Sequence, residues 1–76
     1  MSAKDMFEEL GYEENNDRED TLRYTIKNMV GDIVEIRFYF NSKSFIKEGY
    51  EDDLGYIITL EELQAINKQI EELGWK

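Results

Sequence analysis

The chain has 76 residues and a formal net charge of −9, and it contains neither histidine nor cysteine. It therefore lacks the side chain that titrates near neutral pH, the usual thiolate nucleophile, and the common imidazole and thiolate metal ligands. Carboxylates, lysines, hydroxyls and tyrosines remain for chemistry, and we expect a binding protein rather than an enzyme.

The chain begins with the pattern of a short helix, predicted over about residues 3–10. Ser2 is a suitable N-cap, because Asp5 lies three positions later as in a capping box. Gly11 supplies the left-handed position that follows many helices. The acidic segment 13–20 is rich in turn formers, and we expect it to be an exposed loop.

Two strands are predicted next, because apolar and polar residues alternate with a period of two. The first begins at Thr21 and the second runs over residues 33–40, with a glycine-bearing turn at residues 29–32 between them. We expect the apolar side chains of both strands to share one face of a sheet. A third, shorter strand is predicted over residues 44–47, and the pattern does not show which of its faces points inward.

The last predicted element is a helix that begins after Thr59, which forms a capping box with Glu62. Apolar residues at helical spacing predict its buried stripe: Leu60, Leu63, Ile66, Ile70 and Leu73. Before this helix, residues 48–55 are expected to form an acidic loop. Residues 56–58 are expected to form a fourth strand or an extended lead-in.

This order of elements predicts one α+β domain over residues 1–76. An antiparallel meander of three or four strands would carry both helices on one face, in the order α-β-β-β-(β)-α, and would leave the other face open. No segment resembles a signal peptide or approaches the ~20 apolar residues of a membrane span. Together with the absence of cysteine, this predicts a cytoplasmic protein without a membrane partner.

The candidate chemistry is sparse, and we expect no catalytic residue, no metal site and no cofactor. Paired carboxylates could support acid–base hydrolysis, but so short a chain cannot enclose a cleft of about 300–1,000 Å³ and keep a core. Residues 15–26 resemble an EF-hand loop at first, but Asp20 stands at its glycine position and Ile26 at its glutamate position. The five glycines are isolated, which gives a phosphate-binding loop no support.

The charge is segregated along the chain. Residues 1–20 carry eight acidic and two basic residues, residues 21–47 two acidic and five basic, and residues 48–76 eight acidic and two basic, which gives −6, +3 and −6. The chain therefore has two acidic ends around a basic centre.

The basic centre suggests one candidate site, on the uncovered face of the sheet. Its residues would be Arg23, Lys27, Arg37 and Tyr39, with Thr25 beside them and Lys47 as a further candidate. An aromatic ring among cations can stack the bases of a single-stranded nucleic acid. The simpler interpretation is that these cations pair with Glu35 and the acidic loops, because a net charge of −9 repels a polyanion.

The acidic ends suggest a second candidate site, through an echo between the two helix ends. The segment FEELGY at 7–12 recurs as IEELGW at 70–75. A glutamate in the last turn faces the negative end of the helix dipole and lowers helix stability by about 0.3–1 kcal/mol. Lys4 and Lys68 each lie four residues before one of these glutamates, and such ion pairs recover about 0.2–0.5 kcal/mol. One explanation is solubility. The other is an acidic and aromatic patch that binds a basic protein, with both aromatic residues at least half exposed: Glu8, Glu9, Tyr12, Glu71, Glu72 and Trp75.

The two ends of the chain, MFEELGY at 6–12 and ITLEELQAINKQIEELGW at 58–75, resemble a group of small acidic proteins of phages, prophages and mobile elements of Gram-positive bacteria. The middle shares with that group only its alternating, aromatic-rich pattern. The matching residues are capping and core positions that carry no assigned activity. What the resemblance implies is a context, since small acidic phage proteins often bind a host protein, sometimes a nuclease or defence complex whose nucleic-acid site they occupy.

These patterns together predict a non-enzymatic domain that binds a basic protein partner through acidic surface. If a phage encodes it, it would act in the host cytoplasm and inhibit a nucleic-acid-binding or defence protein. Two alternatives stay open. The open sheet face could bind single-stranded nucleic acid, or it could pair with a second copy in a homodimer, in which Tyr39 would be buried.

Overall fold

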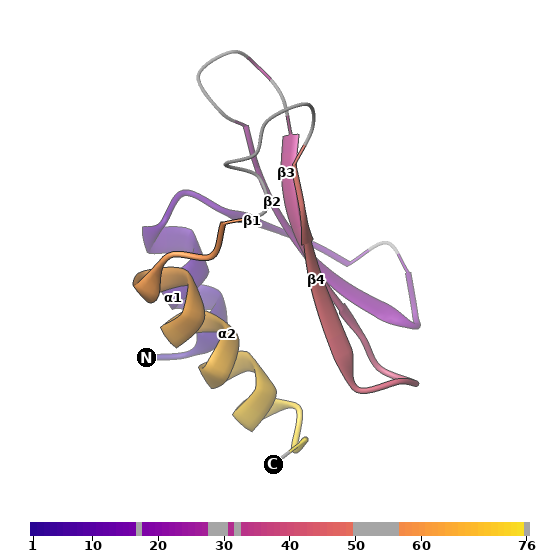
Figure 1. Cartoon of the computed structure of the whole chain (residues 1–76). Coiled ribbons are helices and arrows are strands. Elements are labelled where there is room, and N and C mark those ends of the chain that lie inside the picture. The colour runs from indigo at the N-terminus through magenta and orange to yellow at the C-terminus, as the bar shows by residue number, and fades with distance from the viewer. Residues whose placement is uncertain (17, 28–30, 32, 50–56, 76) are drawn as a thin grey trace.

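The computed structural model describes residues 1–16, 18–27, 31, 33–49 and 57–75. In chain order its elements are α1 (Ala3–Glu9), β1 (Glu13–Asn15), β2 (Thr21–Lys27), β3 (Ile33–Tyr39), β4 (Ser44–Glu48) and α2 (Leu60–Glu72). The four strands form one antiparallel sheet in the order β1-β2-β3-β4, and both helices lie on one side of it (Figure 1). The predicted α+β fold, with a helix at each end of a meander, is confirmed.

Both helices begin with the predicted capping boxes. The Ser2 hydroxyl accepts the Asp5 N–H at 3.1 Å, and the Thr59 hydroxyl accepts the Glu62 N–H at the same distance. Each carboxylate in turn accepts the N–H of its capping residue. Gly11 follows α1 with φ of +97°, a conformation that favours glycine. Neither described helix combines the length and the apolar character needed to cross a bilayer.

The core lies between the helices and the middle of the sheet. The register pairs Leu22 with Phe38 and Tyr24 with Ile36, so these four side chains share the face toward the helices. The Phe7 ring of α1 stacks on Tyr24 with centroids 4.0 Å apart. The buried core residues, taken together, come from both helices, both central strands and the segment after α1: Phe7, Tyr12, Leu22, Tyr24, Ile36, Phe38, Ala65 and Ile66.

The inward face of β4 is defined by its register with β3. Phe45 lies opposite Phe38 and Lys47 lies opposite Ile36, so both side chains point toward the helices. The placement of Lys47 on the open sheet face is therefore wrong. Its ammonium group instead reaches Glu62 of α2 at 2.9 Å.

The sheet differs from the prediction at its edges. Residues 13–15, expected in a loop, form β1, because the backbone of Glu13–Asn15 pairs with residues 23–25 of β2. Residues 57–59 lead into α2 and form no strand, and Thr59 has an extended backbone. Residue 56, the first of the predicted fourth strand, lies outside the described residues. The predicted turn at 29–32 and the predicted loop at 48–55 lie largely outside the described residues.

The buried face of α2 is rotated from the predicted apolar stripe. Ile66, Ile70 and Leu73 do pack on the core, but Leu60 is 67% exposed and Leu63 is 42% exposed. Buried polar side chains replace them, and the reason is hydrogen bonding across the helix–sheet interface. Glu62 and Gln69 must reach partners on other elements, and this turns Leu60 and Leu63 toward water.

Candidate functional site

The two helices lie side by side and run in opposite directions (Figure 1). Tyr12, just after α1, donates its hydroxyl hydrogen bond to Glu62 in the first turn of α2. At the other end, the Glu72 carboxylate accepts the Ala3 N–H at 2.8 Å. Glu72 thus lies at the positive end of the α1 dipole, which offsets the cost of its own place in the last turn of α2.

Carboxylates from three elements gather around Tyr24, whose hydroxyl donates to Gln69 at 2.6 Å. Burial raises the pKa of Tyr24, and the negative charges of Glu14, Glu72 and Glu8 raise it further. The structure therefore brings Glu8 and Glu72 of the predicted patch into one neighbourhood. It adds Glu14 of β1, which the sequence did not indicate because three residues are too few for a period of two to be recognised.

The remaining residues of the predicted patch divide by exposure. Glu9 and Glu71 are exposed. Tyr12 is only 4% exposed, so the expectation that it is at least half exposed is wrong. Trp75 is half-buried, with its ring 6.3 Å from that of Phe38. In both cases the residue after the glycine folds back onto the core, because the left-handed turn points the chain inward.

The outer surface of the helices carries exposed carboxylates from both of them, and we call this surface the acidic helix layer: Asp5, Glu8, Glu9, Glu61, Glu71 and Glu72. Its cations lie close to glutamates. Lys4 is 3.9 Å from Glu8 and 3.7 Å from Glu14. Lys68 is 3.9 Å from Glu71 rather than paired with Glu72, whose carboxylate is held by α1. The layer therefore presents net negative charge to solvent.

On the open sheet face, in contrast, the two arginines are paired with carboxylates. The register places Arg23 directly opposite Arg37 on the face away from the helices. Both guanidinium groups bind Glu35, Arg23 at 3.3 Å and Arg37 through Nε at 2.9 Å. Arg37 also donates to the Tyr39 hydroxyl at 2.6 Å and lies 5.7 Å from the centre of that ring. Hydrogen bonds to Tyr39 and Glu35 raise the pKa of Arg37.

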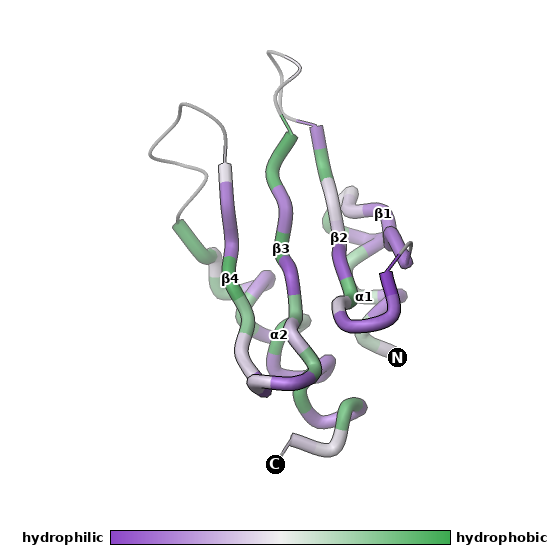
Figure 2. The backbone as a smooth tube through the Cα atoms, turned by 90° about the vertical axis from the view of Figure 1, so that its right-hand side faces the viewer, coloured by the Kyte–Doolittle hydropathy of each residue, from purple (hydrophilic) through white to green (hydrophobic). Residues whose placement is uncertain are grey.

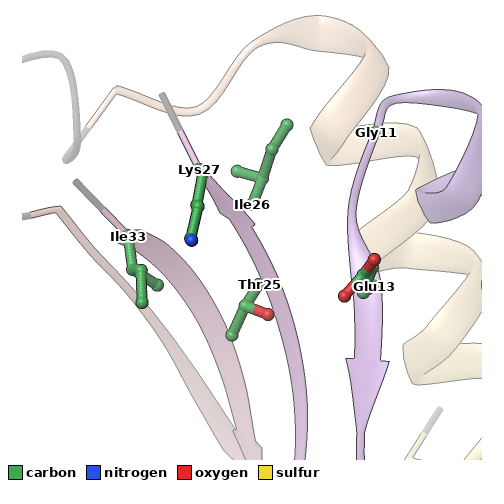
Figure 3. Close-up of a pocket in the computed structure, with 6 residues that line it drawn as sticks. All are labelled: Gly11, Glu13, Thr25, Ile26, Lys27 and Ile33. Carbon is green, nitrogen blue, oxygen red and sulfur yellow. The ribbon is translucent and has the colours of Figure 1, made fainter. Parts of the chain in front are cut away.

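Lys27, the other predicted cation of this face, borders a hollow of about 460 Å³ at the end of β2 (Figure 3). Glu13, Thr25 and Ile33 line the same hollow. The Thr25 hydroxyl accepts a hydrogen bond from Asn15 at 2.9 Å. Within the described part of the chain no hydrogen bond joins Lys27 to Glu13 or Thr25, so these groups form no nucleophile–base pair. Nor do the described carboxylates include a group of three placed to hold a metal ion.

A buried ionic contact connects β4, α2 and the segment after α1. Lys47 Nζ lies 2.9 and 3.2 Å from the two carboxylate oxygens of Glu62 and also donates to the Ile57 carbonyl. The side chains of Lys47 and Glu62 are only 7% and 10% exposed, and we call this pair the Lys47–Glu62 bridge. Burial alone would raise the pKa of Glu62, but hydrogen bonds from Tyr12, Thr59 and Lys47 and the lysine charge outweigh it and lower the pKa.

Comparison with known proteins finds no matching family model, no matching curated protein and no matching solved structure. The function must therefore be argued from the surfaces described above.

Proposed function

We propose that this protein is a non-enzymatic domain that binds a basic protein surface through the acidic helix layer. The asymmetry of charge between the two faces carries this proposal. Six exposed carboxylates stand on the helices, and two lysines accompany them. On the sheet face the two arginines are already paired with two carboxylates, those of Glu35 and Glu48. A basic partner therefore finds unpaired negative charge on the helices.

A nucleic-acid-binding protein is the partner class that fits this surface best. Such proteins carry clustered lysine and arginine on the face that contacts phosphates. An array of carboxylates can occupy that face in place of the phosphate backbone. The resemblance of the chain ends to small phage proteins agrees with a role as an inhibitor of a host protein in the host cytoplasm.

A capture experiment tests the proposal. The immobilised protein is exposed to a panel of purified nucleic-acid-binding proteins at ~0.15 M and at ~0.5 M salt, where charges beyond a few ångström are screened. We expect retention of basic members at the lower salt and loss at the higher. The variant Glu9→Gln/Glu71→Gln should retain less, because it removes two charges from the acidic helix layer.

The matched control is Glu13→Gln/Glu19→Gln, which removes the same charge from exposed positions outside the helices. If net charge alone drives retention, the two double variants will lose it equally, and the assignment to the helix layer fails. If no basic protein is retained at the lower salt, the proposed function itself fails.

Single-stranded nucleic acid is not expected to bind the open sheet face. Arg23 and Arg37 would have to leave Glu35 before contacting phosphate, and the net charge opposes the encounter. Fluorescence titrations with single-stranded RNA and DNA at low salt should therefore be flat. A saturable titration that Tyr39→Ala abolishes would reverse this conclusion in favour of stacking on the sheet.

A further inference from the structure

Four large apolar side chains are exposed around the start of α2, and we call them the apolar cluster: Ile57, Ile58, Leu60 and Leu63. Their exposed fractions run from 39% to 67%. Among the described residues six large apolar side chains are exposed, and four of them lie within the seven residues 57–63. Isolated exposed apolar residues are ordinary, but a cluster on a domain of net charge −9 indicates a contact surface.

The fold accounts for only part of the cluster. Ile58 and Leu63 occupy the positions before the N-cap and in the second turn that form a hydrophobic staple. Leu60, the first residue of α2, belongs to neither the cap nor the core, and it is the most exposed of the four. Neither capping nor core packing therefore accounts for the exposure of Leu60.

The Lys47–Glu62 bridge holds the cluster in place. Lys47 donates to the Ile57 carbonyl, and Glu62 accepts the Thr59 N–H at 2.9 Å. The backbone that carries the four apolar side chains is thus tied to β4 and to the first turn of α2. A surface ordered before binding loses little conformational entropy when a partner docks.

A hollow of about 420 Å³ lies at the same end of α2 as the cluster. Leu10, Ile26 and Val34 contribute apolar walls, and Thr59 and Glu61 line it at the start of α2. Its lining also includes Lys27 and the paired Lys47 and Glu62. The hollow is more open than a pocket that encloses a small molecule, which suits a side chain presented by a partner protein. Binding energy at protein interfaces concentrates where an anchor side chain fills such a pocket beside a polar rim.

We infer that the apolar cluster and this hollow are the centre of the docking surface, and that the partner segment carries an apolar or aromatic side chain flanked by lysine or arginine. The inference rests on the proposed function and specifies its partner. Glu61 is exposed and lines this hollow, so the rim of the hollow joins the acidic helix layer. A second copy of the chain would bring like charges together here, which disfavours self-association.

Two synthetic peptides of equal length and equal lysine content test the inference. One carries tryptophan and leucine between its lysines, and the other carries serine and glycine at the same positions. We expect the first to bind at least about tenfold more tightly, since it buries apolar surface as well as pairing charge. In spectra of the isotope-labelled protein, it should shift the amide resonances of residues 57–63. The variant Leu60→Gln, which leaves the staple residues in place, should remove most of the difference between the peptides.

Ile33→Gln is the matched control, because Ile33 is 53% exposed but lies on the open sheet face. It should leave both affinities unchanged. Equal binding of the two peptides would overturn the inference and leave the proposed function standing, whereas no binding of either would overturn both. If the Leu60→Gln variant melts several degrees below the parent, the cluster contributes to the fold rather than to binding. If the parent sediments as a dimer and the Leu60→Gln variant as a monomer, the cluster is a surface for self-association. Either result also overturns the inference.

Discussion

Replacing Phe38 with alanine is expected to unfold the domain. Phe38 is fully buried on β3, and its ring lies 5.8 to 6.4 Å from the ring centres of Phe7, Phe45 and Trp75. A buried Phe→Ala change costs about 3–5 kcal/mol. Domains are stable by about 5–15 kcal/mol, and one this short lies near the lower limit. Circular dichroism should show loss of the folded signal at 25 °C, and urea titration should show little or no transition.

Two controls separate this effect from a general sensitivity of the sheet. Phe38→Leu keeps most of the volume, and we expect it to remain folded with a smaller loss of unfolding free energy. Ile33→Ala, at an exposed position on the same strand, should change that free energy by less than about 0.5 kcal/mol. If Phe38→Ala stays within about 1 kcal/mol of the parent, this ring does not join the helices to the sheet.

The parts of the fold that could be predicted are those with local patterns. The capping boxes of Ser2 and Thr59 define both helix starts, and the period of two defines β2 and β3 (Figure 2). β1 could not be predicted, since its pairing with β2 depends on backbone partners rather than on its own side chains. The inward face of β4 could not be predicted either, because Lys47 at an inward position breaks the alternation of apolar and polar residues.

The candidate site was predictable to a similar extent. The echo of glutamates led to Glu8 and Glu72, which the structure brings near Tyr24. The same echo predicts an exposed Tyr12 ring, which is wrong because the glycine turn that ends α1 directs the following ring into the core. Glu62 was recognised as a capping residue, but its second partner comes from another element. That tertiary contact rotates α2 and exposes Leu60, and no local pattern encodes it.

Replacing Lys47 with methionine is expected to have the second large effect on stability. The change leaves the Glu62 carboxylate buried without its cation, and removing one partner of a buried ion pair typically costs about 3–5 kcal/mol. Lys47→Met should therefore be close to unfolded, with a urea transition that is weak or shifted to very low urea. Lys47→Met/Glu62→Leu should recover only part of the lost free energy, because Tyr12 and the Thr59 N–H then lose their acceptor. If Lys47→Met is no less stable than the parent, the bridge contributes nothing to the fold.

The pH dependence of stability provides an independent measure of the same carboxylate. The pKa of Glu62 is lowered in the folded protein, so its contribution is complete above the ordinary carboxyl pKa and is lost as pH falls through the lowered value. Between about pH 5 and pH 3 the unfolding free energy of the parent should therefore fall more steeply than that of Glu62→Gln. The exposed carboxylates of the acidic helix layer are common to both proteins, so the difference in slope belongs to Glu62. Parallel slopes would mean that protonating Glu62 is no harder in the fold than in the unfolded chain, and the Lys47–Glu62 bridge could then not hold the docking surface in place.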